Sequence, residues 1–428
     1  VALSSELRKV LGWGMVAVVG GLAAAGTILF VGEIAHAASA GLTAHVDLHA
    51  TTPALAHQDI LIPPVQMDSA DAAVQRSVAN HLVPGATLAV GERDHIVQLE
   101  GYGRVGWRAR DAVASPDSTI YDLASLTKAI ATTTAVLLLV QDGKIHLDDT
   151  VQHVLPEFEG KWKDRVTWRQ LLTHTSGLPP AGRMRGDIPS QRLRSLLRTK
   201  LDALPGQYVQ YSDLSFITLW AAAERVAGEP LPQLLERRVW KPLGMTSTSF
   251  WPGESCVRCA PTLILHSGEP YRGKPSDPVA HKLGEPTGNA GLFSTAHDLA
   301  RFAEMIANGG AVDSVRILDA DLVAQLFHQT PRAGHRTLGW DAFCPAEHPK
   351  QQQICQQPIA FGHTGWTGTS IWIDPRRGVW VVILSNRSYD VKRPASLDEL
   401  RGDVFLDVAG ATSDSARTGQ AKTMVVAR

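Results

Sequence analysis

The strand-like segments of this sequence lie near the two ends of its ordered part, and helical segments lie between them. Residues 86–103 contain two short apolar runs around the polar turn 91–94, a pattern typical of a β-hairpin. A second hairpin is predicted over 363–386, with the turn 374–378 between strongly apolar strands. Helix and loop patterns prevail from about 105 to 355. The simplest architecture that joins strands from both ends is an antiparallel sheet in an α+β fold.

Helices are predicted to flank this sheet and to fill the middle of the chain. The first helix begins at Asp68 or Ser69, either of which can cap it, and stops at 84–85. The last helix opens at 396–399, where Ser and Glu have the spacing of a capping box. A helical lobe, including a well-marked helix within 295–310, is inserted between the hairpins. The cleft between sheet and lobe is the expected ligand site.

The N-terminal segment is predicted to insert into a membrane, as a signal peptide or as an anchor. Residues 10–32 carry no charge and follow Arg8 and Lys9 directly. The run is longer than the apolar part of a signal peptide (about 7–15 residues) and suits a spanning helix (about 20 residues). It is followed at 35–40 by small-x-small patterns that signal peptidases cleave. A cleaved signal peptide and an uncleaved inner-membrane anchor both stay open, and either one exports the folded part to the periplasm or another extracytoplasmic compartment.

The predicted organisation has four parts. Residues 1–40 are the signal peptide or anchor, and 41–66, rich in Pro, His and Thr without periodicity, are a linker. Residues 67–410 form the folded domain, and 411–428 are a flexible tail. The 41 basic and 42 acidic residues are spread without long blocks, so nothing indicates nucleic acid or a polybasic membrane patch as a partner. We expect a small-molecule or peptide partner, and neither a metal nor another cofactor.

The four cysteines are expected to form disulfides, because an even number in an exported chain favours them. Of the three possible connectivities, the local one joins Cys256 to Cys259 and Cys344 to Cys355 without crossing the fold. A zinc site is the alternative, but the second pair lacks the close spacing of a Cys-x-x-Cys ligand arm.

Ser125 and Lys128 lie three positions apart at the start of a long apolar stretch. Residues 126–140 contain one charge, Lys128, and a helix that is apolar on every face is buried. With Asp122 as cap, Ser125 falls in the first turn, where free N–H groups favour a developing oxyanion. Burial is expected to lower the pKa of Lys128 towards that of a usable base. The alternative is a polar first-turn serine beside a lysine whose side chain extends to water.

A second candidate segment is Tyr211-Ser212-Asp213, which follows a Pro-Gly turn and precedes an apolar helix. The phenol of Tyr211 could accept and return protons near an activated lysine, and the carboxylate of Asp213 could hold that lysine. The alternative is that Asp213 caps the next helix and Tyr211 packs against it.

A third candidate segment, His363-Thr364-Gly365, is predicted to open a strand. The glycines within 362–368 are poor for a strand interior, and close approach of a substrate backbone to the strand edge would explain them. A substrate acyl group could pair with Thr364 and Gly365, while the N–H of Trp366 joins that of Ser125 in an oxyanion hole. The alternative is a bulge beside a core histidine.

Together, Ser-Leu-Thr-Lys at 125–128, Tyr-Ser-Asp at 211–213 and His-Thr-Gly at 363–365 resemble the motifs of the serine β-lactamase and DD-peptidase superfamily. They are most similar to its tyrosine-motif branch, which includes class C β-lactamases, DD-carboxypeptidases, D-aminopeptidases and related esterases, and within it to penicillin-binding proteins of the 4B type. The resemblance covers about 68–408. It implies a β-lactamase/DD-peptidase-like fold.

The resemblance also implies roles for the motif residues. Ser125 is the acylated nucleophile, Lys128 its proton acceptor and Tyr211 a general acid and base. Asp213 then orients Lys128 or the substrate amide, and His363 binds the substrate carboxylate or tunes Tyr211. We therefore expect an acyl-enzyme hydrolase that reacts covalently with penicillins.

Two departures from the lactamase pattern bear on the substrate. Asp213 stands where such lactamases usually carry asparagine, and His363 stands where they carry lysine. A carboxylate cannot donate to a β-lactam side chain, and a neutral imidazole holds a carboxylate less firmly than an ammonium. D-alanyl peptides or small esters are therefore the expected substrates. The alternatives are a penicilloyl-binding receptor without turnover and a weak class C-type β-lactamase.

Overall fold

A computed structural model describes residues 64–264, 269–344, 353–391 and 394–410. The predicted signal peptide or anchor, most of the predicted linker and the predicted tail lie outside these described residues. Among the described residues, no helix has the length and apolar character needed to cross a membrane.

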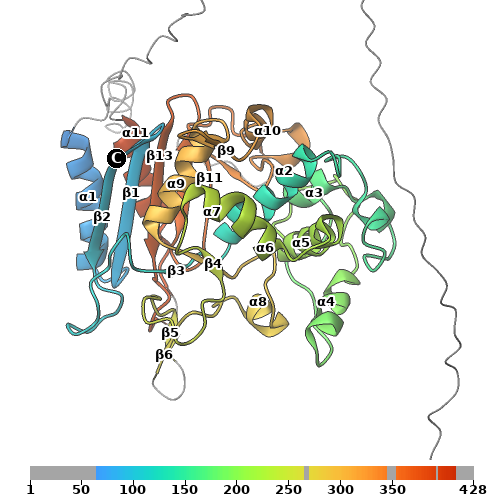
Figure 1. Cartoon of the computed structure of the whole chain (residues 1–428), viewed down its shortest axis with the longest axis horizontal. Helices are drawn as coiled ribbons and strands as arrows, with labels where there is room; N and C mark the ends of the chain where they lie inside the picture. Colours follow the sequence, from blue (N-terminus) through green and yellow to red (C-terminus); the bar gives the residue numbers. More distant parts are fainter. Residues whose placement is uncertain (1–63, 265–268, 345–352, 392–393, 411–428) are drawn as a thin grey trace, which may run out of the picture. The chain divides into compact units, whose positions relative to one another are not determined.

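Within the described ranges, the main sheet has six antiparallel strands in the order β10-β11-β12-β13-β1-β2 (Figure 1). Its strands are β1 (Gly85–Glu92), β2 (His95–Gly103), β10 (Asp341–Phe343), β11 (Ala360–Thr364), β12 (Ser370–Asp374) and β13 (Val379–Ser385). Both predicted hairpins are present, as β1–β2 and β12–β13. They join through the β1–β13 ladder, which runs from Ala86 opposite Ser385 to Glu92 opposite Val379. The predicted antiparallel sheet is therefore confirmed.

Helices cover both faces of the sheet. The terminal helices α1 (Pro64–Ala79) and α11 (Asp398–Gly410) pack against each other and against one face, and α9 (Ala296–Ala307) packs against the other. The side chain of Thr295 caps α9 by accepting from the Asp298 N–H, as its spacing predicts. Helix α1 begins four residues before its predicted cap Asp68.

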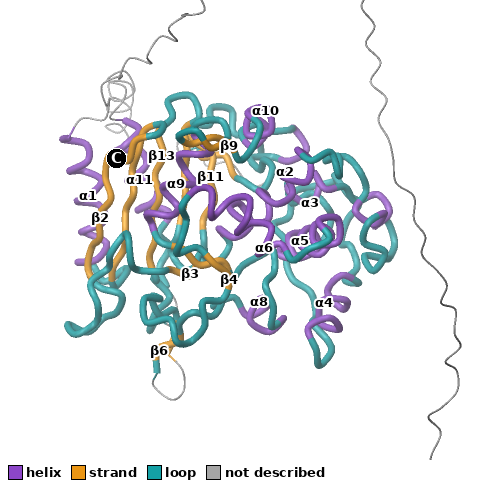
Figure 2. The backbone as a smooth tube through the Cα atoms, viewed as in Figure 1, coloured by secondary structure: helices purple, strands orange, loops and turns teal. Residues whose placement is uncertain are grey.

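The helical lobe comes from the middle of the chain, to the right of the sheet in Figure 2. Its helices are η1 (Lys128–Thr133), α2 (Thr134–Gln141), η2 (Val151–His153), η3 (Lys163–Arg165), α3 (Trp168–Leu172), α4 (Pro189–Leu197), α5 (Asp213–Ala227), α6 (Leu231–Leu235), η4 (Glu236–Trp240), α7 (Lys241–Leu243), α8 (Pro278–Leu283), α10 (Ala320–Leu326) and η5 (Pro331–Ala333). The short strands are β3 (Tyr121–Asp122), β4 (Ser249–Phe250), β5 (Leu263–Ile264), β6 (Pro270–Tyr271), β7 (Leu292–Ser294), β8 (Ala311–Val312) and β9 (Val315–Arg316). The predicted scarcity of strands in this region holds, because these strands have only two or three residues each.

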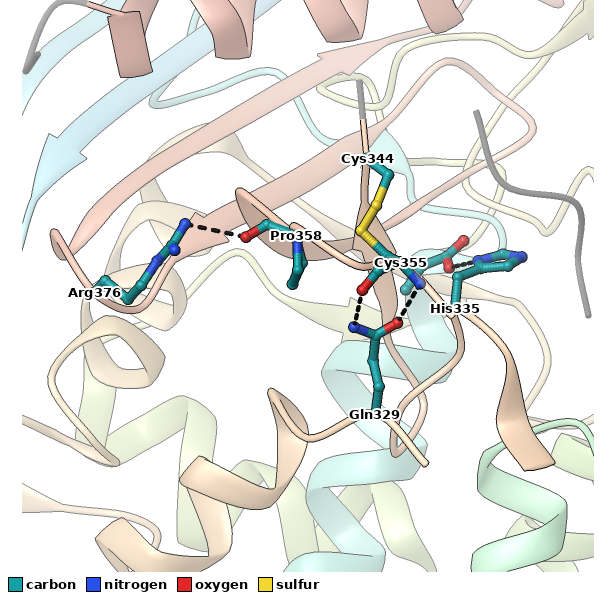
Figure 3. The surroundings of a disulfide bond; sticks show 7 residues. Gln329, His335, Cys344, Cys355, Pro358 and Arg376 are labelled. Carbon is teal, nitrogen blue, oxygen red and sulfur yellow. Dashed lines mark hydrogen bonds and ion pairs between the residues drawn. A yellow bond between two sulfur atoms is a disulfide. The ribbon is translucent and has the colours of Figure 1, made fainter. Parts of the chain in front are cut away.

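The cysteines pair locally, as predicted, so the zinc alternative is wrong. Cys256 bonds to Cys259 around a tight turn, and Cys344, directly after β10, bonds to Cys355. The side chain of Gln329 fixes the second bridge by accepting from the Cys355 N–H at 2.9 Å and donating to its carbonyl at 3.0 Å (Figure 3).

Candidate active site

Ser125 lies in a strained turn between β3 and η1. Ala124 has φ +48°, a left-handed conformation that a residue with a Cβ adopts only when its surroundings hold it there, and such residues cluster at functional sites. Asp122 holds this turn by accepting from the Ala124 N–H at 2.9 Å and from Ser276 at 2.7 Å. The prediction that Ser125 belongs to the first helical turn is therefore wrong. The left-handed residue before Ser125 breaks the helical path, so the serine lies just ahead of the helix.

Lys128 is completely buried, with 0% of its surface exposed. Its Nζ lies 2.7 Å from Asp213 Oδ1, and it donates to Ser125 Oγ at 3.0 Å and to the carbonyl of Asn289 at 2.9 Å. The three protons of an ammonium group therefore each have an acceptor.

The charge state of Lys128 differs from the one predicted. Burial by itself lowers the pKa of Lys128, but the negative charge of Asp213 and the hydrogen bonds with Asp213 and Tyr211 raise it above the ordinary value of a lysine. The expectation that burial produces a usable base is therefore wrong for the free protein. Lys128 is held as an ammonium that touches the serine hydroxyl.

Asp213 is available to Lys128 because its neighbour caps α5. Ser212 is the N-cap, and its Oγ accepts from the Ser215 N–H at 3.2 Å and donates to the Pro179 carbonyl at 2.7 Å. Asp213 is the first residue of the helix and directs its carboxylate to the lysine. The alternative in which Asp213 caps the helix is therefore wrong.

Tyr211 lies at the centre of the cluster. The centroid of its ring is 4.5 Å from that of His174 and 6.2 Å from that of His363. Lys128 Nζ and Arg336 Cζ lie 5.0 Å and 5.2 Å from the same centroid. Two cations on one aromatic ring attract its π-electrons and limit its movement. The phenol is thus positioned beside Lys128, where protons can pass between them.

His363 lies near the end of β11. The prediction that it opens a strand is therefore wrong. Its Nδ1 is 2.7 Å from the carbonyl of Thr364, which can only accept, so Nδ1 carries the proton. Its buried Nε2 has no hydrogen-bond partner among the described residues. Burial, together with the charges of Arg336 and Lys128, lowers the pKa of His363 to about 3. The imidazole is therefore neutral near pH 7 and presents an acceptor, not a charge.

The third motif docks directly on the turn that carries Ser125. A Cβ at Gly365 would lie 2.4 Å from the carbonyl oxygen of Leu123, so only glycine permits this approach. Thr367 Oγ1 donates to the Asp122 carbonyl at 2.6 Å and Thr369 Oγ1 to the Leu123 carbonyl at 3.0 Å. The predicted reason for this glycine is therefore wrong, because the protein's own backbone, rather than a substrate, fills the space.

Two backbone N–H groups remain open near this contact. Among the described residues, neither Ser125 nor Trp366 donates its N–H to a protein acceptor. Trp366 is 49% exposed. Strand β10 pairs with β11 only as far as Gly362, so the edge at His363 and Thr364 is unpaired on that side. A carbonyl oxygen bound by both N–H groups would be polarised as in an oxyanion hole.

Several residues outside the three motifs complete the cluster. His174 is buried, has φ +58° and accepts from the Ser212 N–H at 3.0 Å; burial and nearby cations lower its pKa well below the usual value. Arg336 is held by Asp341 at 3.3 Å, and Asp341 also contacts His335. His174 falls in the stretch LLTHTSGLP, which resembles the family and could have indicated it. Arg336 belongs to no motif.

This chain is similar to known proteins in sequence and in fold. The family model "Beta-lactamase" matches residues 70–405. A "Putative D-alanyl-D-alanine carboxypeptidase" of Salmonella agona is 31% identical over 360 residues, covering 76% of this chain and 82% of that protein. A β-lactamase/D-alanine carboxypeptidase from Pseudomonas syringae superposes with a TM-score of 0.65 at 18% identity, over 82% of this chain and 99% of that one. EstCE1, a hydrolase with promiscuous acyltransferase activity, has a TM-score of 0.63 at 22% identity, over 81% and 98%.

Proposed function

Since this chain belongs to the β-lactamase family and is a serine hydrolase of the β-lactamase and DD-peptidase superfamily, we propose that it is a D-alanyl-D-alanine carboxypeptidase that also accepts small esters. The observation that carries this proposal is the contact between Ser125 Oγ and Lys128 Nζ at 3.0 Å, with Asp213 and Tyr211 around the ammonium. The neutral His363 and the acidic Asp213 favour a peptidase over an efficient β-lactamase. Residues 67–410 form the catalytic domain in this proposal. The two disulfides support an extracytoplasmic location.

The proposed reaction proceeds through two acyl transfers. Ser125 Oγ attacks the carbonyl carbon of the penultimate D-alanine, whose oxygen takes up negative charge between the N–H groups of Ser125 and Trp366. The C–N bond breaks, and the leaving amine of the terminal D-alanine receives a proton. Water then attacks the acyl-enzyme and releases the shortened peptide. In this proposal the unpaired edge of β11 at Thr364 holds the donor, and Gly365 follows it directly.

Proton transfer in this mechanism depends on the pair Lys128 and Tyr211. The ammonium of Lys128 cannot accept the proton of Ser125, so the reactive form is the one in which the pair has lost one proton. That form takes the serine proton during attack and delivers it to the leaving amine. Asp213 sets the pH at which the reactive form appears, because its charge favours the protonated pair.

A panel of three substrates tests the proposed function. Diacetyl-L-Lys-D-Ala-D-Ala should release D-alanine, a p-nitrophenyl ester should be cleaved, and a chromogenic cephalosporin should be hydrolysed slowly. Intact-protein mass after incubation with a penicillin should show an adduct that disappears with time. A lasting adduct without D-alanine release would instead indicate a penicilloyl-binding receptor. Absence of both adduct and turnover would contradict the proposal.

Replacing Asp213 by asparagine should move the ascending limb of the pH profile of kcat/KM to lower pH by about one unit or more. The charge of Asp213 raises the pKa of Lys128 against the effect of burial, so its removal lets burial lower that pKa. Deprotonation then occurs at lower pH. Asp148→Asn is the matched control, since Asp148 pairs with Arg169 at the surface. If the ascending limb does not shift in Asp213→Asn, the titration that controls the rate is not that of Lys128.

A further inference from the structure

One short stretch of the helical lobe is strongly basic, although the whole chain has a formal net charge of -1. Residues 181–201 contain six Arg or Lys residues and a single acid, Asp187. These residues form no continuous block of charge, but they share one element and its flanking loops. Helix α4 and its flanking loops form this stretch, which lies below α5 in Figure 1.

The stretch folds around a groove of about 920 Å³. Arg183 and Arg185 line it from the loop before α4, and Arg194, Arg198 and Lys200 line it from the helix and the loop beyond. The only acid in the lining is Asp202, and no aromatic side chain contributes to it within the described residues. The groove is therefore cationic and has no platform on which a nucleic-acid base could stack.

The cations of this groove differ in how they are paired. Arg198 bonds to Glu159 at 2.7 Å, and Arg194 also borders a neighbouring hollow that contains Glu157. Arg183, Arg185 and Lys200 are exposed and have no ion pair or side-chain hydrogen bond among the described residues. Like charges gathered without counter-charges repel one another, so their grouping favours an anionic ligand.

Hydrogen bonds hold the backbone around the groove in place. Arg192 donates to the carbonyls of Gly186 and Asp187 at 3.2 Å and 2.8 Å and to that of Lys282 at 2.8 Å. Ser195 Oγ accepts from the Arg185 N–H at 2.8 Å. These bonds tie the basic loop to α4 and to α8, so the cations project from a fixed backbone.

The groove also adjoins the proposed active site. The carbonyl of Pro179, which lines the groove, accepts a hydrogen bond from Ser212 Oγ at 2.7 Å, and the carbonyl of Pro180 accepts from the Asp213 N–H at 3.0 Å. The segment that lines the groove therefore also holds the Tyr211–Asp213 motif. A peptide donor that extends from Ser125 past this motif therefore runs towards the segment that carries the cations.

We propose that this groove binds carboxylate groups of the peptide acyl donor, at positions remote from the bond that is cleaved. Guanidinium groups bind carboxylates through paired N–H donors. Arg183 and Arg185 each bring one guanidinium group to the groove, which the ammonium group of Lys200 also lines. The inference rests on the proposed carboxypeptidase function and names its preferred substrates as peptides with extra acidic groups. Neutral peptides and small esters reach Ser125 without this contact.

Two donors that differ only in charge test the proposal. Disuccinyl-L-Lys-D-Ala-D-Ala carries two more carboxylates than the diacetyl peptide. At low ionic strength its kcat/KM should exceed that of the diacetyl peptide about threefold to tenfold, and the ratio should fall as salt is added. In the triple variant Arg183→Gln, Arg185→Gln, Lys200→Gln the ratio should fall to about one.

A second triple variant controls for net charge. Arg110→Gln, Lys144→Gln and Lys241→Gln remove three exposed cations that do not line the groove, and this variant should keep the wild-type ratio. Thermal unfolding midpoints establish that both triple variants are folded. A wild-type ratio near one, or an equal fall in both variants, would overturn the proposal.

The result also separates this inference from the proposed function. If the wild-type protein cleaves the diacetyl donor without preferring the disuccinyl one, the function stands and the groove proposal fails. If neither donor is cleaved, fluorescein-labelled disuccinyl peptide is titrated with each protein and followed by anisotropy. If the wild-type and control proteins bind the peptide and the groove variant does not, the groove proposal is supported and the proposed carboxypeptidase function fails. Absence of binding, or equal competition by a single-stranded oligonucleotide, would overturn the groove proposal.

Discussion

Replacement of Ser125 by alanine is expected to abolish covalent labelling by penicillins and to lower kcat/KM for D-alanyl peptides by at least about 10³-fold. The change removes the oxygen that contacts Lys128 Nζ at 3.0 Å. Among the described residues, no other serine or threonine hydroxyl contacts that ammonium. The fold should be unaffected, since among the described residues the Ser125 side chain forms a hydrogen bond only with Lys128. Intact-protein mass and D-alanine release measure the two effects.

Ser314→Ala is the matched control for this experiment, because Ser314 lies in the exposed turn between β8 and β9 and away from the motifs. It should be labelled and should turn over substrate like the wild-type protein. Labelling or undiminished D-alanine release by Ser125→Ala would assign the nucleophile to another residue.

Replacement of Lys128 by methionine is expected to lower kcat/KM by about 10²- to 10⁴-fold, the range for loss of a general acid and base. Methionine occupies similar space but cannot carry or transfer a proton. It also leaves the Asn289 carbonyl without its donor, which costs about 1–3 kcal/mol of the free energy of unfolding. Asp213 loses its partner as well, but 26% of its side chain is exposed, so water can solvate it. Substrate kinetics and urea unfolding measure the two effects separately.

Lys163 offers a matched control for Lys128. It is a second buried lysine of the helical lobe, 1% exposed, whose Nζ donates to the Leu197 carbonyl and lies 4.4 Å from the centroid of the Phe158 ring. Burial lowers the pKa of Lys163 to about 8, because the charge of Glu159 opposes it only in part and no carboxylate among the described residues forms an ion pair with this lysine. Lys163→Met should lose stability but keep its activity. An equal loss of activity in both variants would make the role of Lys128 structural.

Several features of this protein could be predicted from short stretches of sequence. The hairpins follow from alternation around turn residues, the cap of α9 from Thr295, and the two disulfides from cysteines close in sequence. The three ordered motifs predicted the family, and the strand and helix patterns at both ends of the ordered part predicted the sheet with its flanking helices.

Other features could not be predicted because they depend on contacts between distant segments. The left-handed Ala124 follows from how β3 pairs with β7 and how Thr367 and Thr369 hold the turn. The position of Arg336 beside Tyr211 follows from its bond to Asp341 on β10, which no motif indicates. The basic groove is lined by α4 and by the loops on both sides of it, so it depends on how these segments fold together.

The sequence by itself determined which groups this protein brings to its proposed site: a serine, a lysine, a tyrosine, an acid and a histidine, each within a recognisable motif. Only the tertiary structure decided their charges. Lys128 and Lys163 are both buried, yet the pKa of one is raised and that of the other is lowered, because a carboxylate 85 positions away in sequence lies 2.7 Å from the first. Burial and Coulomb interactions depend on distance in space and on the surrounding medium, and neither can be read from the order of residues along the chain.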